Sequence, residues 1–203
     1  MKKLLCLGAC LVLLAGCAAP QQPNADLATL QRVAYVDPGA PALTLITVIN
    51  NRTGQGGHTA LMVSGSERVI FDPAGSFHAD IVPEYNDVLY GIRPAVFQAY
   101  RSAHARTTFH VKTQRLEVTP AQAETALELV KTNGRVPGVY CANATSRILQ
   151  QVPGLEQIST TFYPVKLSEQ FDALGAVQSE LYYEGDDEDL KKGIAASNAA
   201  LNG

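Results

Sequence analysis

The sequence predicts an α+β fold in which an antiparallel sheet packs against helices. Three observations support this prediction. Strand-like segments precede the clearest helical segments, and the two types show little of the regular alternation that is typical of a parallel sheet. Two of the strands flank a short Ser-Gly-Ser turn, as in an antiparallel hairpin. Hydrophobic residues make up 46% of the 203 residues and charged residues 17%, so the chain can form a sizeable core.

Runs of β-branched and apolar residues predict the strands. "LTLITVI", residues 43–49, is typical of a buried strand. Residues 58–64 and 67–72 alternate in polarity and are expected to pair as a hairpin. Residues 107–118 alternate over a longer stretch, which predicts a strand with one face in water.

Apolar spacing and end signals predict the helices. Residues 119–134 give the clearest one, because Thr119 can cap its start, Pro120 suits the first helical position and Gly134 can end it. A second helix is expected to begin near Cys141 and to end before a Pro-Gly pair. Two shorter helices are predicted within residues 95–105 and 163–175.

The first 17 residues, "MKKLLCLGACLVLLAGC", are predicted to be a lipoprotein signal peptide. Lys2 and Lys3 form its positively charged start, and residues 4–14 are apolar but too short to span a bilayer comfortably. Residues 14–17, Leu-Ala-Gly-Cys, look like a bacterial lipobox, in which the cysteine thiol takes the lipid. We therefore expect lipidation at Cys17, with a plain secretory signal as the alternative.

The rest of the chain is predicted to divide into three parts. Residues 18–40, rich in Pro, Ala and Gln, are expected to be a tether to a domain spanning residues 41–183. Residues 184–203 are acidic and then rich in Ala and Asn, which predicts a loose tail. Ala18 is not the aspartate that usually holds lipoproteins at the inner membrane. We thus expect a cell-envelope protein, lipid-anchored to the outer membrane and facing the periplasm.

Charge and motif content argue against several function classes. The formal net charge is −3, and loss of Lys2 and Lys3 would make it −5, so nucleic acid is not expected as the main partner. The scattered histidines lack the spacing of a metal site, and the Gly-rich loop at residues 50–57 matches no phosphate-binding fingerprint. No metal or cofactor is therefore predicted. The chain also lacks the Gly-x-Ser-x-Gly motif of many serine hydrolases.

Cys141 is the candidate nucleophile. Cys6 and Cys10 would leave with the signal peptide and Cys17 would take the lipid, so Cys141 has no partner for a disulfide. Residues 135–140 contain Pro and Gly and are expected to lie outside the following helix. Free backbone N–H groups and the helix dipole at such a start favour a thiolate, the reactive form of cysteine. The alternative is a small apolar side chain packed on one helical face.

His58 is the candidate general base that such a cysteine needs. It opens a strand directly after Gly56-Gly57, where little side-chain bulk crowds it, and the rest of that strand is apolar. The alternative is a histidine at a strand edge facing water. His110 is expected to be solvated, and His78 and His104 are expected to be surface residues without a role.

Asp72 is the candidate third residue, which would orient the imidazole. If the hairpin loop comprises Ser64 to Ser66, His58 lies directly opposite Asp72. If the loop comprises only Gly65-Ser66, His58 faces Pro73 and Asp72 points to the other side of the sheet. Asp72 could also simply form part of an ordinary strand-ending turn.

These residues give the sequence a resemblance to a known family. The order of "GHTAL" opening a strand, a hairpin with an acidic end, and "YCANAT" opening a helix resembles the circularly permuted, NlpC-like branch of the papain-fold thiol hydrolases. That branch includes bacterial lipoproteins and lecithin:retinol acyltransferase-like enzymes. The resemblance covers about residues 43–170 and implies a permuted papain-like fold. It also implies Cys141 as nucleophile, His58 as general base and Asp72 as the third residue.

The sequence thus leads to two hypotheses about function. The first is a lipid-anchored cysteine hydrolase that acts on an amide or peptide bond, with peptidoglycan as the expected substrate; a lipid acyl hydrolase or acyltransferase of the same fold is the alternative. The second is a non-catalytic envelope lipoprotein that binds a partner or acts as a scaffold, with Cys141 serving only in packing.

Overall fold

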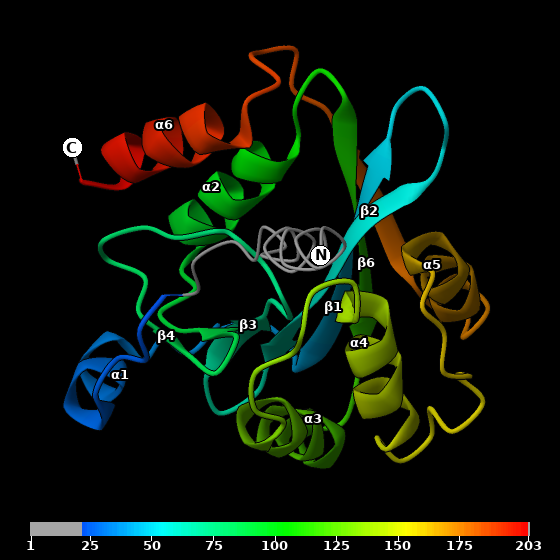
Figure 1. The fold of residues 1–203 in the computed structure, drawn as a ribbon. Helices are drawn as coiled ribbons and strands as arrows, with labels where there is room; N and C mark the ends of the chain where they lie inside the picture. The colour runs from blue at the N-terminus through cyan, green and yellow to red at the C-terminus, as the bar shows by residue number, and fades with distance from the viewer. Residues whose placement is uncertain (1–21, 203) are drawn as a thin grey trace, which may run out of the picture.

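A seven-stranded antiparallel sheet forms the centre of the computed structural model, which describes residues 22–202 (Figure 1). Its strand order is β4-β5-β3-β2-β1-β6-β7. The strands are β1 (Ala42–Asn50), β2 (Gly56–Ser64), β3 (Arg68–Phe71), β4 (Glu84–Tyr85), β5 (Val88–Leu89), β6 (Phe109–Glu117) and β7 (Gln178–Tyr182). The helices are α1 (Leu27–Val33), α2 (Pro94–His104), α3 (Pro120–Thr132), α4 (Cys141–Gln150), α5 (Pro164–Asp172) and α6 (Leu190–Asn202).

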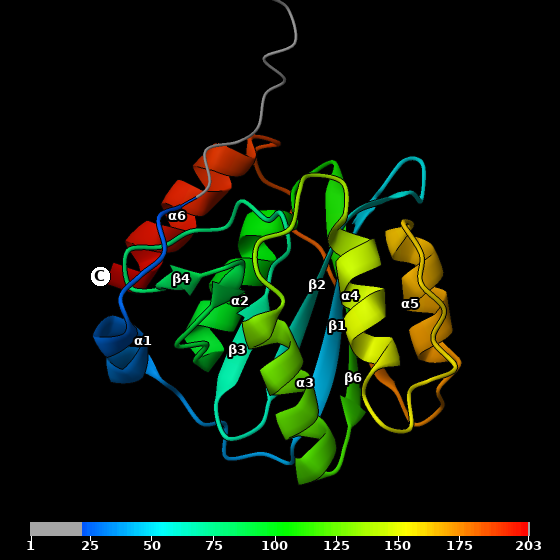
Figure 2. The same cartoon turned by 60° about the horizontal axis from the view of Figure 1, so that its bottom comes forward.

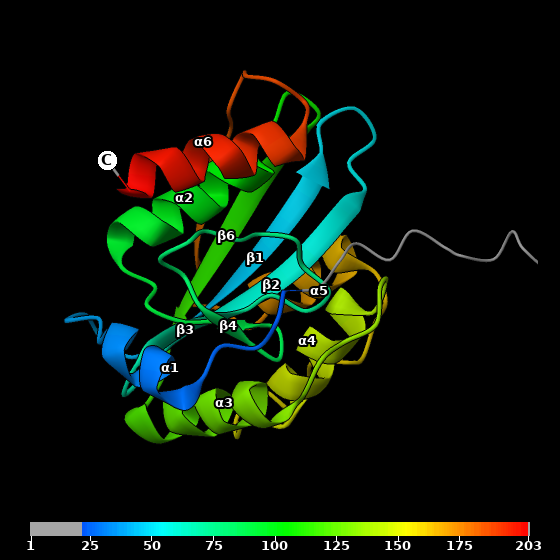
Figure 3. The same ribbon diagram turned by 60° about the vertical axis from the view of Figure 1, so that its left-hand side comes forward.

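Helices cover both faces of the sheet. Figure 2 shows α3, α4 and α5 on one face, and Figure 3 shows α2 and α6 side by side on the other. The alternation of side chains along β1 explains the two cores, because Leu43 and Leu45 pack toward the first group of helices and Ile46 and Val48 toward the second. The predicted α+β fold with an antiparallel sheet is confirmed.

Most of the expected elements are present close to their predicted bounds. The helix predicted at residues 119–134 is α3, and Thr119 and Gln122 form a full capping box at its start. Gly134, just past its end, has a φ of 77°, a conformation that glycine adopts without strain. The helix expected near Cys141 is α4, which begins at that residue.

Two expectations outside the central sheet are wrong. Part of the predicted tether, residues 27–33, forms α1, whose Leu30 is buried in the core. Part of the predicted loose tail forms α6, whose Ile194 is buried against the α2 side of the sheet. Each helix has a few apolar residues that pack into the core, although the composition of its segment is mostly polar or rich in small residues. The predicted signal peptide, the lipidated Cys17 and the first residues of the tether lie outside the described residues.

Within residues 22–202, no helix is both long enough and apolar enough to cross a bilayer.

Candidate active site

His58 lies near the start of β2, directly after a β-bulge. Val48 of β1 pairs with His58, but the next residue, Ile49, pairs with Gly56, so Gly57 is the extra residue. Both glycines sit against other segments. A Cβ atom at Gly56 would lie 2.5 Å from Pro164 Cβ, and one at Gly57 would lie 3.1 Å from the Phe109 ring. The bulge and these close approaches fix the backbone that presents His58.

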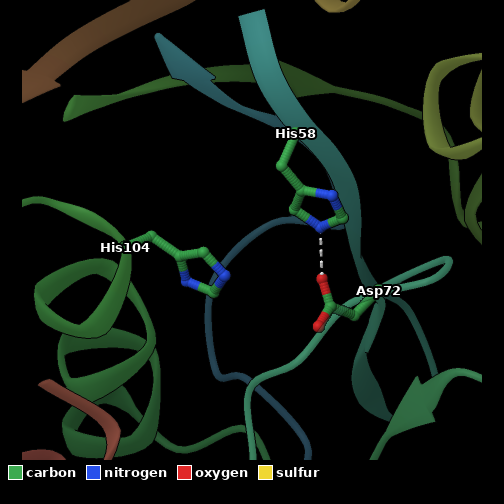
Figure 4. Close-up of side chains that lie close together, drawn as sticks. All are labelled: His58, Asp72 and His104. Carbon is green, nitrogen blue, oxygen red and sulfur yellow. Dashed lines mark hydrogen bonds and ion pairs between the residues drawn. The ribbon is translucent and has the colours of Figure 1, made fainter. Parts of the chain in front are cut away.

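Asp72 follows directly after β3 and contacts the His58 ring. His58 Nε2 lies 2.7 Å from Asp72 Oδ1 (Figure 4). The hairpin register differs from both predicted registers, because Ser64 pairs with Arg68 and the loop comprises residues 65–67. This register places Asp72 beside Ala60 and diagonally across from His58. Residues 58 and 60 point to the same face of the sheet, so the diagonal contact is within reach of an imidazole.

The Asp72 carboxylate is buried and held from several sides. The Tyr100 hydroxyl, on α2, donates a hydrogen bond of 2.6 Å to the same Oδ1 atom. Gly75 packs directly onto the carboxylate, since a Cβ atom there would lie 1.8 Å from Asp72 Oδ2. The Gly75 N–H donates to the Asp72 main-chain carbonyl over 2.9 Å. The orientation of the carboxylate toward His58 is therefore determined by the surrounding residues.

Cys141 is the first residue of α4, and its side chain is buried with 8% of the residue exposed. A turn precedes it, in which the Tyr140 N–H donates to the Pro137 carbonyl. Val139 in this turn has a φ of 67°, which is unusual for a β-branched residue. The first backbone N–H groups of α4 have no partner within the helix, and that of Ala142 interacts with the sulfur atom.

The pKa values of the three groups favour an ion pair. Burial opposes ionisation of Cys141, but its hydrogen bond and charge interaction with His58 lower the pKa of the thiol, and the backbone N–H groups of Thr59 and Ala142 add to this. Burial by itself lowers the pKa of His58, but Asp72 and Cys141 raise it to about 10. Burial favours the neutral acid at Asp72, whereas His58 holds the pKa of that carboxyl below its usual value.

The two nitrogens of the His58 ring thus have different partners. Nε2 is used by Asp72, which leaves Nδ1 as the nitrogen that interacts with the Cys141 thiol. His58 therefore lies between the Cys141 side chain and the Asp72 carboxylate and interacts with both. Such an arrangement can take a proton from the thiol and return it to a leaving group.

His104 also lies at this site, so the expectation of a surface residue is wrong. It ends α2, is buried, and its Nδ1 donates to the Tyr100 carbonyl over 2.8 Å. Its ring stacks on that of His58, with centroids 5.8 Å apart and an interplanar angle of 11°. Burial lowers the pKa of His104. The sequence does hold a signal for this position, because Val96, Tyr100 and His104 lie on one face of a helix.

His58, Asp72 and His104 also bear on metal binding. Among the residues that the structure describes, these three have potential ligand atoms that all lie within 4.8 Å of one another. Neighbouring ligand atoms around a tetrahedral Zn²⁺ are separated by about 3.3 Å, given metal–ligand bonds of about 2 Å. The 2.7 Å between His58 and Asp72 is shorter than that. The arrangement therefore fits a hydrogen-bonded network better than a metal site.

The structure brings together all three candidate residues of the predicted domain, Cys141, His58 and Asp72, at the ends of α4, β2 and β3. Comparisons with protein-family models, with curated proteins and with solved structures found no match to this chain.

Proposed function

We propose that this chain is a cysteine hydrolase or acyltransferase whose catalytic residues are Cys141, His58 and Asp72. The observation that carries the proposal is the position of His58, which contacts the buried Asp72 carboxylate at 2.7 Å and interacts with Cys141 at the N-terminus of α4. A residue that served only in packing would need neither the imidazole nor the carboxylate.

The proposed reaction has two steps. The Cys141 thiolate attacks the carbonyl carbon of an acyl group, and backbone N–H groups at the start of α4 stabilise the developing oxyanion. His58 then donates its proton to the leaving group as the tetrahedral intermediate collapses to a thioester. Water or another acceptor attacks the thioester, His58 takes the acceptor's proton, and the thiol is restored. Asp72 keeps the imidazole in place and stabilises its charge.

A permuted papain-like fold is part of the same proposal. The strand that carries His58 precedes the helix that carries Cys141 in the chain, and α4 packs against the sheet through Ile148 and Leu149. This is the order on which the resemblance to the NlpC-like branch depends. Folding therefore brings these two residues together although they lie far apart in the chain, as the resemblance to that branch implies.

We propose an amide or peptide bond in the bacterial cell envelope, of the peptidoglycan type, as the substrate. This preference rests on the lipobox at Cys17, which would place the enzyme beside the cell wall. Replacement of Cys17 by Ser should release the protein from membranes, and retention there would contradict the anchor.

A lipid acyl ester is the second candidate substrate, and one observation favours it. Four exposed apolar side chains, Val139, Tyr140, Phe162 and Tyr163, immediately precede α4 and α5. The rings of Tyr140 and Phe162 meet edge to face at 5.3 Å. Val139 and Tyr140 directly precede Cys141 in the chain, so this apolar surface could contact an acyl chain.

Trapping of the acyl-enzyme tests the proposed function. The full chain is mixed with p-nitrophenyl acetate, and Cys141 is examined by peptide mass spectrometry for an acetyl group. We expect one acetyl group at Cys141, none at that position in Cys141→Ala, and acylation slowed about 100-fold or more in His58→Ala. A native Cys141 that takes no acyl group, and that alkylates only after denaturation, would leave the non-catalytic lipoprotein as the better description.

The two candidate substrates are separated by a direct comparison. A peptide amide of the cell-wall type and a phospholipid ester are supplied in turn to the same protein. Release of an amine from the first supports the amide preference, and release of a fatty acid from the second supports the lipid alternative.

A further inference from the structure

Four exposed apolar side chains gather in front of α4 and α5. They are Val139, Tyr140, Phe162 and Tyr163, and we call them the apolar patch; their exposed fractions lie between 43% and 82%. They come from two loops that are far apart in the chain, but the Tyr140 and Phe162 rings meet at 5.3 Å. Figure 2 shows that α4 and α5 begin at the same end of the sheet. Single exposed apolar residues are common on proteins, whereas a cluster of them marks a contact surface.

The patch borders the proposed active site. Tyr140 directly precedes Cys141 in the chain. Pro164, the first residue of α5, packs against Gly56 near the start of the strand that carries His58. Whatever covers the patch therefore lies at the edge of the site and not on a remote face.

The composition of the patch suits the surface of a bilayer. Two of its four members are tyrosines. Tyrosine is enriched where membranes meet water, because its ring is apolar and its hydroxyl is polar. Such a surface places its apolar side chains among the lipid headgroups while its polar groups stay in contact with water.

The described part of the chain begins close to the loop that leads to the patch. The Arg135 guanidinium, four residues before Val139, donates to the Gln22 carbonyl and, over 3.0 Å, to Asn24 Oδ1. Gln22 lies five positions after the lipobox Cys17, which is a reach of at most about 18 Å. A lipid on Cys17 would therefore hold this end of the domain close to the bilayer.

The loops around the patch favour contact with anionic lipid. They comprise residues 50–57, 134–140 and 159–163, and none of them contains Asp or Glu. Arg52, and Lys166 in the first turn of α5, are exposed, and neither takes part in an ion pair with another described residue. Exposed cations of this kind strengthen binding to an anionic membrane surface.

Negative charges in the neighbourhood are buried in the site or belong to the α6 side of the sheet. Within the site, the His58 imidazolium is paired with the buried Asp72 carboxylate. The acidic residues 184–189 belong to the segment between β7 and α6, where Arg106 and Lys192 pair with three of them. The surface around the patch is therefore basic, although the formal net charge of the chain is −3.

We propose that the apolar patch docks onto the surface of the phospholipid bilayer in which the protein is anchored, so that the proposed active site lies beside the lipid headgroups. The inference rests on the lipobox and not on the chemistry of Cys141. The patch orients the domain, whereas the lipid on Cys17 supplies the stable attachment, because a few buried side chains bind a bilayer only reversibly. Loss of the lipid in Cys17→Ser therefore still releases the protein.

Tryptophan fluorescence tests this orientation, because the chain contains no tryptophan. Full-length protein with Tyr163→Trp is bound to vesicles of phosphatidylethanolamine and phosphatidylglycerol, with or without brominated acyl chains. Val36→Trp is the matched control: Val36 is 59% exposed and precedes β1, whose nine residues place the patch end of the sheet roughly 27 Å away. We expect vesicles to shift the Tyr163→Trp emission to shorter wavelength and brominated lipid to quench it, with neither effect for Val36→Trp.

Four results would overturn the inference. If neither emission changes while the protein sediments with the vesicles, the patch stays in water. Equal changes in both variants would mean that the lipid contact is not specific to the patch. A Tyr163→Trp emission that is already shifted without vesicles, and that reverts on dilution, would mean that a second copy of the chain covers the patch. Protein that does not sediment with the vesicles at all would also contradict docking.

Removal of the patch assigns the contact to its residues. Val139→Ser and Phe162→Ser are introduced together into the Tyr163→Trp protein. We expect the quenching by brominated lipid to be lost, because burial of each of these side chains favours docking by about tenfold or more. Leu27→Ser with Leu181→Ser is the matched control, since both leucines are exposed outside the patch and should leave the quenching unchanged. Unchanged quenching in the patch variant would overturn the assignment.

Docking and catalysis can be tested separately. Cys141→Ala removes the proposed nucleophile and should leave the Tyr163→Trp response to vesicles unchanged. If p-nitrophenyl acetate acylates Cys141 but vesicles do not alter the emission, the docking inference fails and the hydrolase proposal stands. If the emission shifts but Cys141 takes no acyl group, the hydrolase proposal fails and the patch stands as a membrane contact.

Discussion

Asp72 lies diagonally across the β2–β3 hairpin from His58, and its Oδ1 atom is 2.7 Å from His58 Nε2. The diagonal geometry has a consequence for the site. A carboxylate directly opposite His58 would extend the β-ladder between the two strands, whereas here the pairing stops at Phe71. The chain after β3 is thereby free to turn, and Gly75 comes back over the carboxylate.

We expect alkylation of Cys141 by iodoacetamide to begin at a pH below the usual thiol pKa of about 8.5, because His58 lowers the pKa of Cys141. Replacement of His58 by Ala should raise the midpoint of the profile, since only the backbone N–H groups of Thr59 and Ala142 would then oppose the effect of burial. The measurement is the rate of labelling at Cys141 against pH, followed by peptide mass spectrometry. His78→Ala is the matched control, because His78 is exposed and should leave the midpoint unchanged. Identical midpoints in the native and His58→Ala proteins would contradict the ion pair.

The His58–Asp72 pair should also make stability depend on pH. The pKa of Asp72 is lowered by folding, so its contribution is present above the unfolded value of about 3.8 and is lost as the pH falls through the folded value. The pKa of His58 is raised, so its contribution is complete below about 6.5 and is lost as the pH rises toward about 10. The stability difference between the native protein and Asp72→Asn should therefore be largest from about pH 4 to 6.5 and should shrink toward pH 10. Urea unfolding at constant ionic strength measures it, and a difference at pH 9.5 as large as that at pH 5 would refute this linkage.

Tyr100→Phe should destabilise the protein by about 1.5–3 kcal/mol, the usual range for a hydrogen bond to a charged group. The Tyr100 hydroxyl donates 2.6 Å to the buried Asp72 carboxylate, and the substitution removes that donor without changing the shape of the ring. Urea unfolding gives the free energy. Tyr163→Phe is the control, because Tyr163 is 71% exposed and should change stability by less than about 0.5 kcal/mol. Equal effects of the two substitutions would show that the Asp72 contact contributes nothing.

The sequence is sufficient to predict β1, β2, β3 and β6 of the sheet, the main helices, and the positions of Cys141, His58 and Asp72 at element ends, for identifiable physical reasons. The β-branched run at residues 43–49 and the cap at Thr119 act locally, so a local pattern reveals them. His58 stands out because a glycine pair precedes it near the start of β2. Cys141 stands out because a turn precedes it at the start of α4.

Other features depend on contacts that no local pattern contains. The hairpin register differs by one residue or two from the predicted registers, and β3 pairs with β5 as well as with β2. His104 is buried because α6 and the loop after β3 close around α2, and both are distant in the chain. Helix α1 forms within a tether-like composition because Leu30 finds a place in the core.

Gly75→Ala should displace Asp72 and destabilise the protein by roughly 1–3 kcal/mol, the usual cost of forcing atoms into a closely packed site. The new Cβ atom would lie 1.8 Å from Asp72 Oδ2, which is a clash with a carboxylate that Tyr100 and His58 hold in place. Acylation of Cys141 should slow along with the loss of stability. Gly138→Ala provides the matched control near the same site, since no atom lies within 4 Å of its Cβ position. If both variants were as stable as the native protein, the close contact at Gly75 would have no energetic consequence.

Val139→Gly should make the protein more stable than Val139→Ala by roughly 0.75 kcal/mol. Val139 has a φ of 67°, and the left-handed conformation costs any residue with a Cβ atom roughly 1–2 kcal/mol. Glycine avoids that cost, although its greater freedom in the unfolded chain offsets about 0.5–1 kcal/mol of the gain. Val139 is 82% exposed, so neither substitution removes substantial packing. Urea unfolding of the two variants gives the difference directly, and alanine at position 139 serves as the reference that keeps the strain. Equal stability of the two variants would show that the turn before Cys141 stores no strain, and the start of α4 would then have to be fixed by Pro137 and the packing of the helix alone.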